Sequence, residues 1–407
     1  MHANDDVRRL ALLPAPEGVN LQVALQQIQG RQLSAQKLPT WAATDGLLYP
    51  PHLSLEQCSS EATASYKRDI VKRLHAQVHF SCFCDLTGGL GVDFSSIAPL
   101  VPQAHYIEQN PVLCDLARHN LPLLGCPHAE VHDSTAEESL STLLPTLPPP
   151  VMVMIDPARR QSSGRKVALI EDCSPDVCAL QNSLRQCADY TLLKLSPMLD
   201  LTAALRTLER VTEVHVVAVS GECKELLLLM QGNASTNATE SHPIDAIPIH
   251  CVDLQPDGSL RAQFCFTLGE EKEAPTNEWR HAISLDEQTY YLYEPNASIL
   301  KAGAFKRIGC HFALSKLAPS THLYISTELI PTFPGRIWRI IDYSSFSKKE
   351  LRRLLQGVES AELTVRGFPT SVAALRKQLR LRDGGNAHFI ATSVSDGSKL
   401  LIKVARA

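Results

Sequence analysis

The sequence of 407 residues lacks any long apolar run, and no stretch reaches the roughly 18–20 residues that a helix needs to cross a membrane. We therefore expect no transmembrane helix and no membrane partner. The first residues, MHANDDVRRL, carry acids where a signal peptide needs a basic region, and no long apolar stretch follows them. Secretion is not expected, and the sequence indicates a cytoplasmic protein.

Closely spaced cysteines are also missing. The 12 cysteines form no Cys-x-x-Cys pair, and the histidines are dispersed along the chain, so the sequence predicts no metal site. The closest pairs are Cys82 with Cys84 and Cys173 with Cys178, and the first pair flanks Phe83 in an apolar run that we expect to be buried. Scattered thiols without pairs are typical of a reduced, cytosolic protein.

The formal net charge is only -4, but it is unevenly distributed. Residues 290–407 contain 18 Lys and Arg and 8 Asp and Glu, a net charge of +10, whereas residues 1–289 contain 21 and 35, a net charge of -14. The basic segment favours a polyanionic partner; alternatively, the two parts neutralise each other through a domain interface. The length predicts two or three domains, each with a sizeable core.

The hydrophobic pattern changes along the chain. Residues 1–78 are expected to be mainly helical, because Leu21–Pro39 has helical apolar spacing and Ser54–Leu74 begins with an N-capping serine. The basic run near the end of the second helix, which includes Lys67, either guides a substrate or forms a solvated face. From 79 to 275, near-continuous apolar strands alternate with helices, which predicts a parallel sheet covered on both faces.

The most specific motif is a Gly-rich turn, Asp85-Leu-Thr-Gly-Gly-Leu-Gly-Val-Asp93, which follows an apolar strand and precedes a predicted helix. Its glycines allow tight turns and a close approach of the backbone to a ligand. The turn lacks the dinucleotide pattern Gly-x-Gly-x-x-Gly and the Gly-Lys-Ser/Thr that cradles phosphates. An acid before the glycines suits a cationic ligand group, such as an amino group; a turn that serves packing alone is the alternative.

Acidic residues also end the next two predicted strands, at Glu108 and Asp133. The first could accept hydrogen bonds from both hydroxyls of a ribose, and the second could accept from an adenine amino group. Single acids often occupy exposed strand ends without binding anything. Three acids at successive strand ends beside a Gly-rich turn nevertheless favour a ligand site, because ligands in open α/β sheets bind at the carboxyl ends of the strands.

Together with Asp156-Pro-Ala-Arg-Arg160, these motifs resemble those of class I S-adenosylmethionine (SAM)-dependent methyltransferases over roughly residues 80–230. The whole chain, including Tyr291–Ala297, resembles bacterial methyltransferase-like proteins with a C-terminal THUMP-like domain. The resemblance implies an α/β fold class, in which a helical region precedes a Rossmann-like core with a mostly parallel seven-stranded sheet. It also implies SAM as the cofactor and RNA as the partner, because THUMP domains proper bind RNA.

On this interpretation, residues 79–275 form the SAM-binding domain, residues 284–328 a small ferredoxin-like α+β domain and residues 329–407 a THUMP-like domain. The candidates for SAM binding lie in the Gly-rich turn and at the strand ends. They are Asp85, Thr87, Gly88, Gly89, Gly91, Asp93, Glu108, Gln109, Asn110, Asp133, Ser134 and Asp156.

The strand that ends at Asp156 is expected to face both the methyl group and its acceptor. Its Asp-Pro-Ala-Arg sequence departs from the [Asp/Asn]-Pro-Pro-[Tyr/Phe] of enzymes that methylate exocyclic base amines. It is nearer to the Asp-Pro-Pro-Arg of enzymes that make 5-methyluridine, but the loop Lys194–Pro197 has no nucleophilic cysteine. A ring nitrogen or a 2'-hydroxyl acceptor stays open. The catalytic candidates are Asp156, Pro157, Arg159 and Lys194, with Lys194 either a substrate contact or the counter-charge of Asp156.

Two basic clusters are candidates for substrate binding. The first is the loop with Arg159, Arg160, Arg165 and Lys166, whose guanidinium groups could clamp phosphates unless Arg159 pairs with a nearby acid. The second is a predicted C-terminal helix, on which Arg376 and Arg380 would share a face because they are four residues apart. The aromatic residues Trp338, Tyr343 and Phe346 either stack on unpaired bases or belong to the core.

The sequence therefore predicts a SAM-dependent methyltransferase that acts on RNA. Two alternatives stay open. One is a non-catalytic RNA-binding protein with a SAM-binding core, and the other is a methyltransferase that acts on a protein or a small molecule. The sequence does not indicate the oligomeric state.

Overall fold

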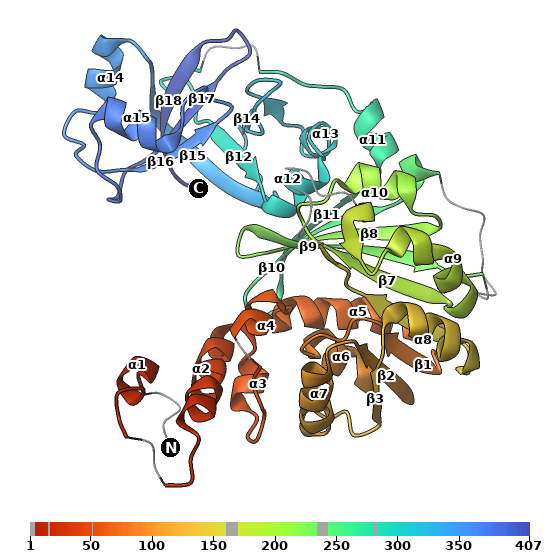
Figure 1. Ribbon diagram of the computed structural model, residues 1–407. Helices are drawn as coiled ribbons and strands as arrows, with labels where there is room; N and C mark the ends of the chain where they lie inside the picture. Colours follow the sequence, from red (N-terminus) through yellow and green to blue (C-terminus); the bar gives the residue numbers. More distant parts are fainter. Residues whose placement is uncertain (1–4, 15–16, 51, 160–169, 234–242, 280–282) are drawn as a thin grey trace. The chain divides into compact units, whose positions relative to one another are not determined.

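The computed structural model describes residues 5–14, 17–50, 52–159, 170–233, 243–279 and 283–407 (Figure 1). Two compact units make up the chain. The first contains Met1–Pro248 and Leu254–Arg261, and the second contains Ile249–Asp253 and Ala262–Ala407.

The N-terminal region is helical, as predicted. Its helices are α1 (Val7–Leu10), α2 (Leu21–Lys37), α3 (Pro39–Ala43), α4 (His52–Gln57) and α5 (Glu61–Val78). The single helix expected from Ser54 is wrong, because Ser54 lies within α4 and the side chain of Ser60 caps α5 by accepting from the N–H of Thr63. A core of buried residues that includes Trp41, Leu55 and Ala64 also contains Val92 of α6 (Val92–Ile97), so α3, α4 and α5 pack on the rest of the first unit.

Seven strands of a nine-stranded sheet form the centre of the first unit, in the hydrogen-bonded order β8-β9-β7-β4-β1-β2-β3. Its strands are β1 (Cys82–Asp85), β2 (Gln103–Glu108), β3 (Ala129–Asp133), β4 (Val151–Ile155), β7 (Tyr190–Leu195), β8 (Val211–Val219) and β9 (Glu222–Gln231). The pairs from β7 through β4, β1 and β2 to β3 are parallel, whereas β9 runs antiparallel to β7 and β8. The mostly parallel arrangement is as predicted, but the described sheet has nine strands rather than the seven expected, because β10 (Ile249–Leu254) and β11 (Leu260–Phe266) also belong to it.

The strands in the middle of this sheet are almost completely buried, as expected for a parallel sheet with two covered faces. Cys82 and Cys84 lie in β1 with no measurable exposure, which confirms the expected buried thiols. Helices alternate with the strands, since α6 follows β1 and α7 follows β2 (Figure 1). The helices of this part are α6 (Val92–Ile97), α7 (Pro111–Leu123), α8 (Ala136–Thr142), α9 (Val177–Cys187) and α10 (Leu201–Thr207).

Four further strands of the described part of the chain precede the second sheet. β5 (Ala158–Arg159) pairs with β6 (Cys173–Ser174) just after β4. β10 (Ile249–Leu254) and β11 (Leu260–Phe266) are neighbours in one sheet, as the predicted hairpin requires, and Gly258 in the turn between them has a positive φ of 85°.

The second unit contains a seven-stranded sheet in the order β13-β14-β12-β15-β18-β17-β16. Its strands are β12 (Tyr291–Pro295), β13 (Ser315–Lys316), β14 (Tyr324–Ser326), β15 (Gly335–Ser345), β16 (Glu362–Arg366), β17 (His388–Ser393) and β18 (Lys399–Arg406), and its helices are α11 (Leu268–Glu273), α12 (Ala297–Ala302), α13 (Arg307–His311), α14 (Lys348–Leu354) and α15 (Val372–Leu379). Antiparallel pairing of β12 with β15 makes the sheet continuous across residues 328 and 329.

None of the helices in the described ranges combines the length and the apolar character that a membrane crossing requires.

Candidate active site

The Gly-rich turn connects β1 to α6 and is hydrogen-bonded to its neighbours on both sides. The carboxylate of Asp85 accepts from the N–H of Thr87 at 3.0 Å, and the Thr87 hydroxyl accepts from the N–H of Asp156 at 2.7 Å. Gly88 donates to the carbonyl of Ile107 on β2 at 2.8 Å. The turn therefore links the carboxyl ends of β1, β2 and β4.

Local packing explains why the turn needs glycine. A Cβ atom on Gly88 would lie 2.2 Å from the ring of Tyr106, whose hydroxyl donates to the carbonyl of Gly89. Gly89 and Gly91 have positive φ angles of 54° and 85°, which glycine adopts without strain. Close contact with Tyr106 thus holds the backbone of the turn in place.

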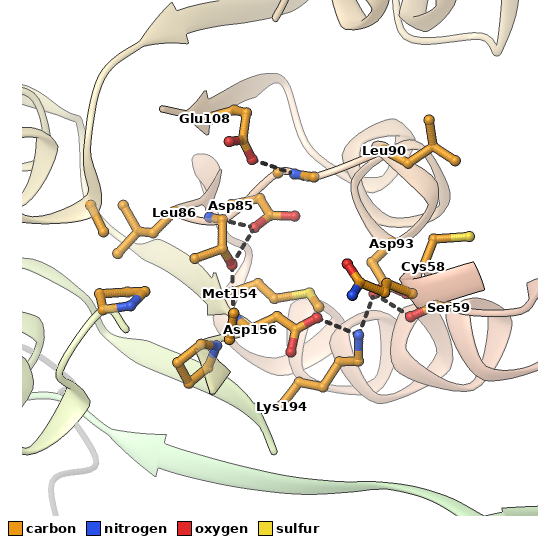
Figure 2. A pocket seen from close by; sticks show the side chains of 18 of the residues that line it. Cys58, Ser59, Asp85, Leu86, Leu90, Asp93, Glu108, Met154, Asp156 and Lys194 are labelled. Atoms are coloured by element: carbon orange, nitrogen blue, oxygen red, sulfur yellow. Dashed lines mark hydrogen bonds and ion pairs between the residues drawn. The ribbon is translucent and has the colours of Figure 1, made fainter. Parts of the chain in front are cut away.

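A cavity of about 710 Å³ opens beside this turn, and Figure 2 shows part of its lining. Its volume is within the range of roughly 300–1,000 Å³ that small-molecule sites occupy. The predicted site residues that line it are Asp85, Thr87, Gly88, Gly89, Gly91, Asp93, Glu108, Gln109, Ser134, Asp156, Pro157 and Lys194. The structure thus brings twelve predicted residues from β1, β2, β3, β4 and β7 to one place.

Two of the predicted SAM-binding residues do not belong to the described lining of the cavity. Asn110 caps α7, since its side-chain oxygen accepts from the N–H of Val112 at 3.0 Å. Asp133 ends β3 but is exposed to solvent. The sequence placed both correctly at strand ends and helix starts, but it could not show which side chains turn toward the cavity.

Glu108 is held by the backbone on two sides. One carboxylate oxygen accepts from the N–H of Gly89 and the other from the N–H of Asn110, both at 2.9 Å. Each carboxylate oxygen has a second lone pair, so Glu108 can still accept from a ligand. Its position on the opposite side of the turn from Asp156 is visible in Figure 2.

Asp85 is buried, and its burial raises the pKa of the carboxyl group to about 7. The charges of Asp93 and Asp156 contribute to this rise of the pKa, whereas the hydrogen bond from Thr87 and the charge of Lys194 oppose it. A cationic group in the cavity would stabilise the ionised form of Asp85. The site is therefore electrostatically suited to an amino group.

Asp156 and Lys194 form an ion pair on the other side of the cavity, as Figure 2 shows. The Lys194 Nζ also lies 3.8 Å from a carboxylate oxygen of Asp93. Burial alone would lower the pKa of Lys194, but the negative charges of Asp156, Asp93 and Glu225 raise it above its ordinary value. Of the two roles left open for Lys194, the structure shows the counter-charge of Asp156.

A second buried lysine extends this arrangement. Lys67 of α5 has 0% exposure, and its Nζ donates to both carboxylate oxygens of Glu225 on β9 at 2.7 Å. It also lies 3.2 Å from Asp93, which accepts from the Ser59 hydroxyl at 2.6 Å. Burial opposes ionisation of Asp93, but the charges of Lys67 and Lys194 keep its pKa below the ordinary value. We call Lys67, Asp93, Asp156, Lys194 and Glu225 the charge network.

Comparison with known proteins identifies the family that the chain resembles. A methyltransferase candidate from Porphyromonas gingivalis W83, known from its crystal structure, matches all of this chain and 96% of its own with 35% identity and a TM-score of 0.84. Two proteins from Mycobacterium tuberculosis strains, described as uncharacterized SAM-dependent methyltransferases, are 24% identical over 349 residues, which cover 85% of this chain and 86% of theirs. Residues 291–334 match a ferredoxin-like domain, and residues 335–406 match a THUMP domain-like family.

The chain belongs to the SAM-dependent methyltransferases that carry a THUMP-like C-terminal domain. The residues around the cavity fit the cofactor. Asp85 is a buried acid that a cationic group would stabilise, Glu108 retains lone pairs for hydroxyl groups, and the glycines bring bare backbone to the cavity wall. The chemistry of these donors and acceptors is that of an amino acid joined to a nucleoside.

The cavity is also lined by residues that were not predicted from the sequence. Cys58 and Ser59, between α4 and α5, line the cavity, and Glu225 enters it from β9. A pattern in the sequence could have revealed Lys67, because it lies on the buried stripe of α5, four residues before the buried Val71. The solvated face considered for the basic run of α5 is therefore wrong for Lys67.

Part of the predicted substrate loop of the methyltransferase lies outside the described residues. Arg160, Arg165 and Lys166 belong to this part. Arg159 contributes its backbone to β5, and its side chain is likewise outside the description.

The predicted C-terminal binding face is wrong in its geometry. α15 ends at Leu379, and Arg380 follows it as a left-handed C-cap with a φ of 57°. Arg376 is directed into the fold: it donates to the carbonyls of Ala361 at 2.9 Å and Arg382 at 3.0 Å, and it pairs with Asp383 at 2.5 Å. The helix thus ends before the two arginines can share a regular face.

The three C-terminal aromatic residues belong to the core rather than to a stacking surface. Trp338 is buried, the hydroxyl of Tyr343 donates to the carbonyl of Ile283 at 2.8 Å, and Phe346 packs against the hydrophobic cluster around Leu354. Of the two roles left open for them, the structure favours the structural one.

Two histidines that are dispersed in the sequence meet in space. His105 on β2 and His132 on β3 approach to 3.1 Å, and Glu130 brings a carboxylate close to both. The pairing of adjacent strands places His105 opposite Glu130. The fold therefore brings together histidines that lie far apart in the sequence.

Proposed function

We propose that this SAM-dependent methyltransferase transfers the methyl group to RNA. The observation that carries the proposal is the THUMP-like match over residues 335–406, in a chain whose segment 290–407 has a net charge of +10. Phosphate neutralisation by Lys and Arg supplies much of the affinity of proteins for nucleic acids. A basic THUMP-like unit joined to a methyltransferase core fits an RNA substrate better than a protein or a small molecule.

The first unit would supply the chemistry. Bound SAM supplies an electrophilic methyl group, and the residues around it determine what that group meets. Asp85 would hold the amino group and Glu108 the ribose hydroxyls, with Thr87, the three glycines, Gln109 and Ser134 completing the site. Asp156, beside Lys194, would orient the acceptor, and proximity of acceptor and methyl group would supply much of the acceleration.

The second unit would hold the RNA backbone. Lys348, Lys349 and Arg352 on α14 are exposed, as are Lys377 on α15 and Lys399 on β18. Exposed lysines and arginines contact phosphates without reading the base sequence. This assignment replaces Arg376, whose guanidinium is bound within the fold, with exposed side chains; Arg380 is also exposed, but it lies beyond the end of α15.

Transfer of labelled methyl from SAM to total RNA tests the proposal. We expect label in RNA, and mass spectrometry of the digested product identifies the modified nucleoside. A parallel incubation with RNA-free protein and small-molecule fractions is the control. Label in one of those fractions and none in RNA would replace the RNA substrate with the other class.

A further inference from the structure

The five side chains of the charge network differ in exposure. The side chain of Asp156 is 38% exposed, that of Lys194 13%, that of Asp93 11%, that of Glu225 4% and that of Lys67 0%. The accessible end of the network thus consists of one carboxylate and one ammonium group beside the same cavity (Figure 2). Any acceptor that reaches Asp156 also meets Lys194.

The ammonium group of Lys194 discriminates between kinds of acceptor. Its pKa is raised by the acids around it, so it remains protonated near neutral pH. A nitrogen acceptor that attacks with its lone pair gains positive charge as the new bond forms, and a neighbouring ammonium opposes that charge. A hydroxyl acceptor develops negative charge on oxygen, and a fixed ammonium stabilises it.

The lining of the cavity is poorly suited to holding a nucleobase. None of the described lining residues is aromatic, and the sequence of 160–169 contains no aromatic residue either. Enzymes that act on a base commonly stack it between aromatic or apolar side chains. A sugar edge needs no such stacking, so the cavity suits a ribose group better than a flipped base.

Covalent chemistry at a base carbon also lacks its nucleophile. Cys58 supplies the one thiol among the described residues that line the cavity. Burial raises the pKa of the Cys58 thiol, and its Sγ is 3.2 Å from the carbonyl of Leu55, to which it donates. A thiol kept protonated in this way is a poor nucleophile.

We propose that the acceptor atom is a hydroxyl oxygen, the 2'-hydroxyl of a ribose in RNA, bound between Asp156 and Lys194. The proposal rests on the RNA substrate proposed above. The Asp156 carboxylate accepts the hydroxyl proton while the Lys194 ammonium donates a hydrogen bond to the oxygen. The oxygen forms its bond to the methyl carbon as the carbon–sulfur bond breaks, and the sulfur keeps that electron pair.

Lys67 acts as a positioning residue in this scheme. It neutralises Glu225 and shares Asp93 with Lys194, at distances of 2.7 and 3.2 Å from its Nζ. Without Lys67, two buried carboxylates would compete with Asp156 for the single remaining ammonium group. Lys67 therefore keeps Lys194 directed toward Asp156.

Alkaline hydrolysis of labelled RNA distinguishes the acceptor atom. A 2'-O-methyl group blocks cleavage at its own phosphodiester, so we expect the label in alkali-stable dinucleotides that yield 2'-O-methylnucleosides. Label in mononucleotides with methylated bases would overturn the hydroxyl acceptor but leave the RNA substrate in place. Label only in protein or small-molecule fractions would overturn the RNA substrate itself.

Variants of the full-length enzyme test the proposed roles of Asp156 and Lys194. Lys194→Met and Asp156→Asn should each lower kcat about 100- to 1000-fold, the effect of removing one group that stabilises developing charge or takes a proton. Calorimetry should show that both variants still bind SAM. Lys72→Met is the control, because Lys72 is exposed on α5 and lies outside both the described cavity lining and the charge network. Wild-type rates in both network variants would overturn the proposal.

Discussion

Charged side chains serve different purposes in the two units. In the first unit, Lys67 and Glu225 are 158 residues apart in sequence, yet they form a buried ion pair beside the cavity. In the second unit, Arg376 satisfies backbone carbonyls of its own fold, while Arg352 lies exposed on α14. The excess of charge in a segment thus does not tell which side chains a partner could reach, because burial and hydrogen bonds decide that.

Removing the deepest charge of the network should have the largest effect on stability. Lys67→Met leaves Glu225 and Asp93 buried without their main counter-charge, which typically costs about 3–5 kcal/mol. Urea unfolding measures the loss. Lys72→Met, at an exposed position of the same helix, should leave the unfolding free energy nearly unchanged. Equal stability of the two variants would mean that the buried network does not stabilise the first unit.

Asp85 should make the stability of the SAM-free protein depend on pH. Its folded pKa of about 7 lies above its ordinary value, so the folded state holds the proton more tightly than the unfolded state. This contribution is complete below about pH 4 and is lost as the pH rises toward 7, by at most about 1.4 kcal/mol per pH unit. Asp85→Asn should flatten the profile of unfolding free energy against pH. Parallel profiles of variant and wild type would contradict the raised pKa.

Glu108 and Asp133 each end a strand, but only Glu108 belongs to the described lining of the cavity. Glu108→Ala should weaken SAM binding about 10- to 100-fold, because a charged hydrogen-bond acceptor is worth about 1.5–3 kcal/mol. Asp133→Ala should bind SAM like the wild type, since Asp133 is exposed and outside the described cavity lining. Calorimetry on both variants measures the contrast. A larger loss in the Asp133 variant would reverse the assignment of the two acids.

The smallest effects are expected in the second unit. Arg376→Ala should reduce stability by about 1–2 kcal/mol, since the carbonyls of Ala361 and Arg382 each lose one hydrogen bond from the guanidinium. Arg352→Ala should leave stability unchanged and reduce the slope of log affinity for single-stranded RNA against log salt by about 0.7. Thermal unfolding and filter binding over a salt series measure these effects. A reduced slope for Arg376→Ala alone would restore Arg376 as the RNA contact.

Much of the first unit could be predicted because its pattern is local. Apolar strands that end in acids, followed by a Gly-rich turn, were sufficient to place Asp85, Glu108 and Asp156 at one edge of a parallel sheet. The second unit was less predictable. Whether Arg380 continues α15 depends on where the helix ends, and the sequence pattern does not fix that point to within one residue.

The sequence by itself determined the fold class and the position of the candidate cofactor site, because strand alternation and glycine conformation are properties of neighbouring residues. Only the tertiary structure decided which charges act together. Lys67, Lys194 and Glu225 come from α5, β7 and β9, elements that are far apart along the chain. Burial removes them from water, and ions removed from water must find partners in space rather than in sequence.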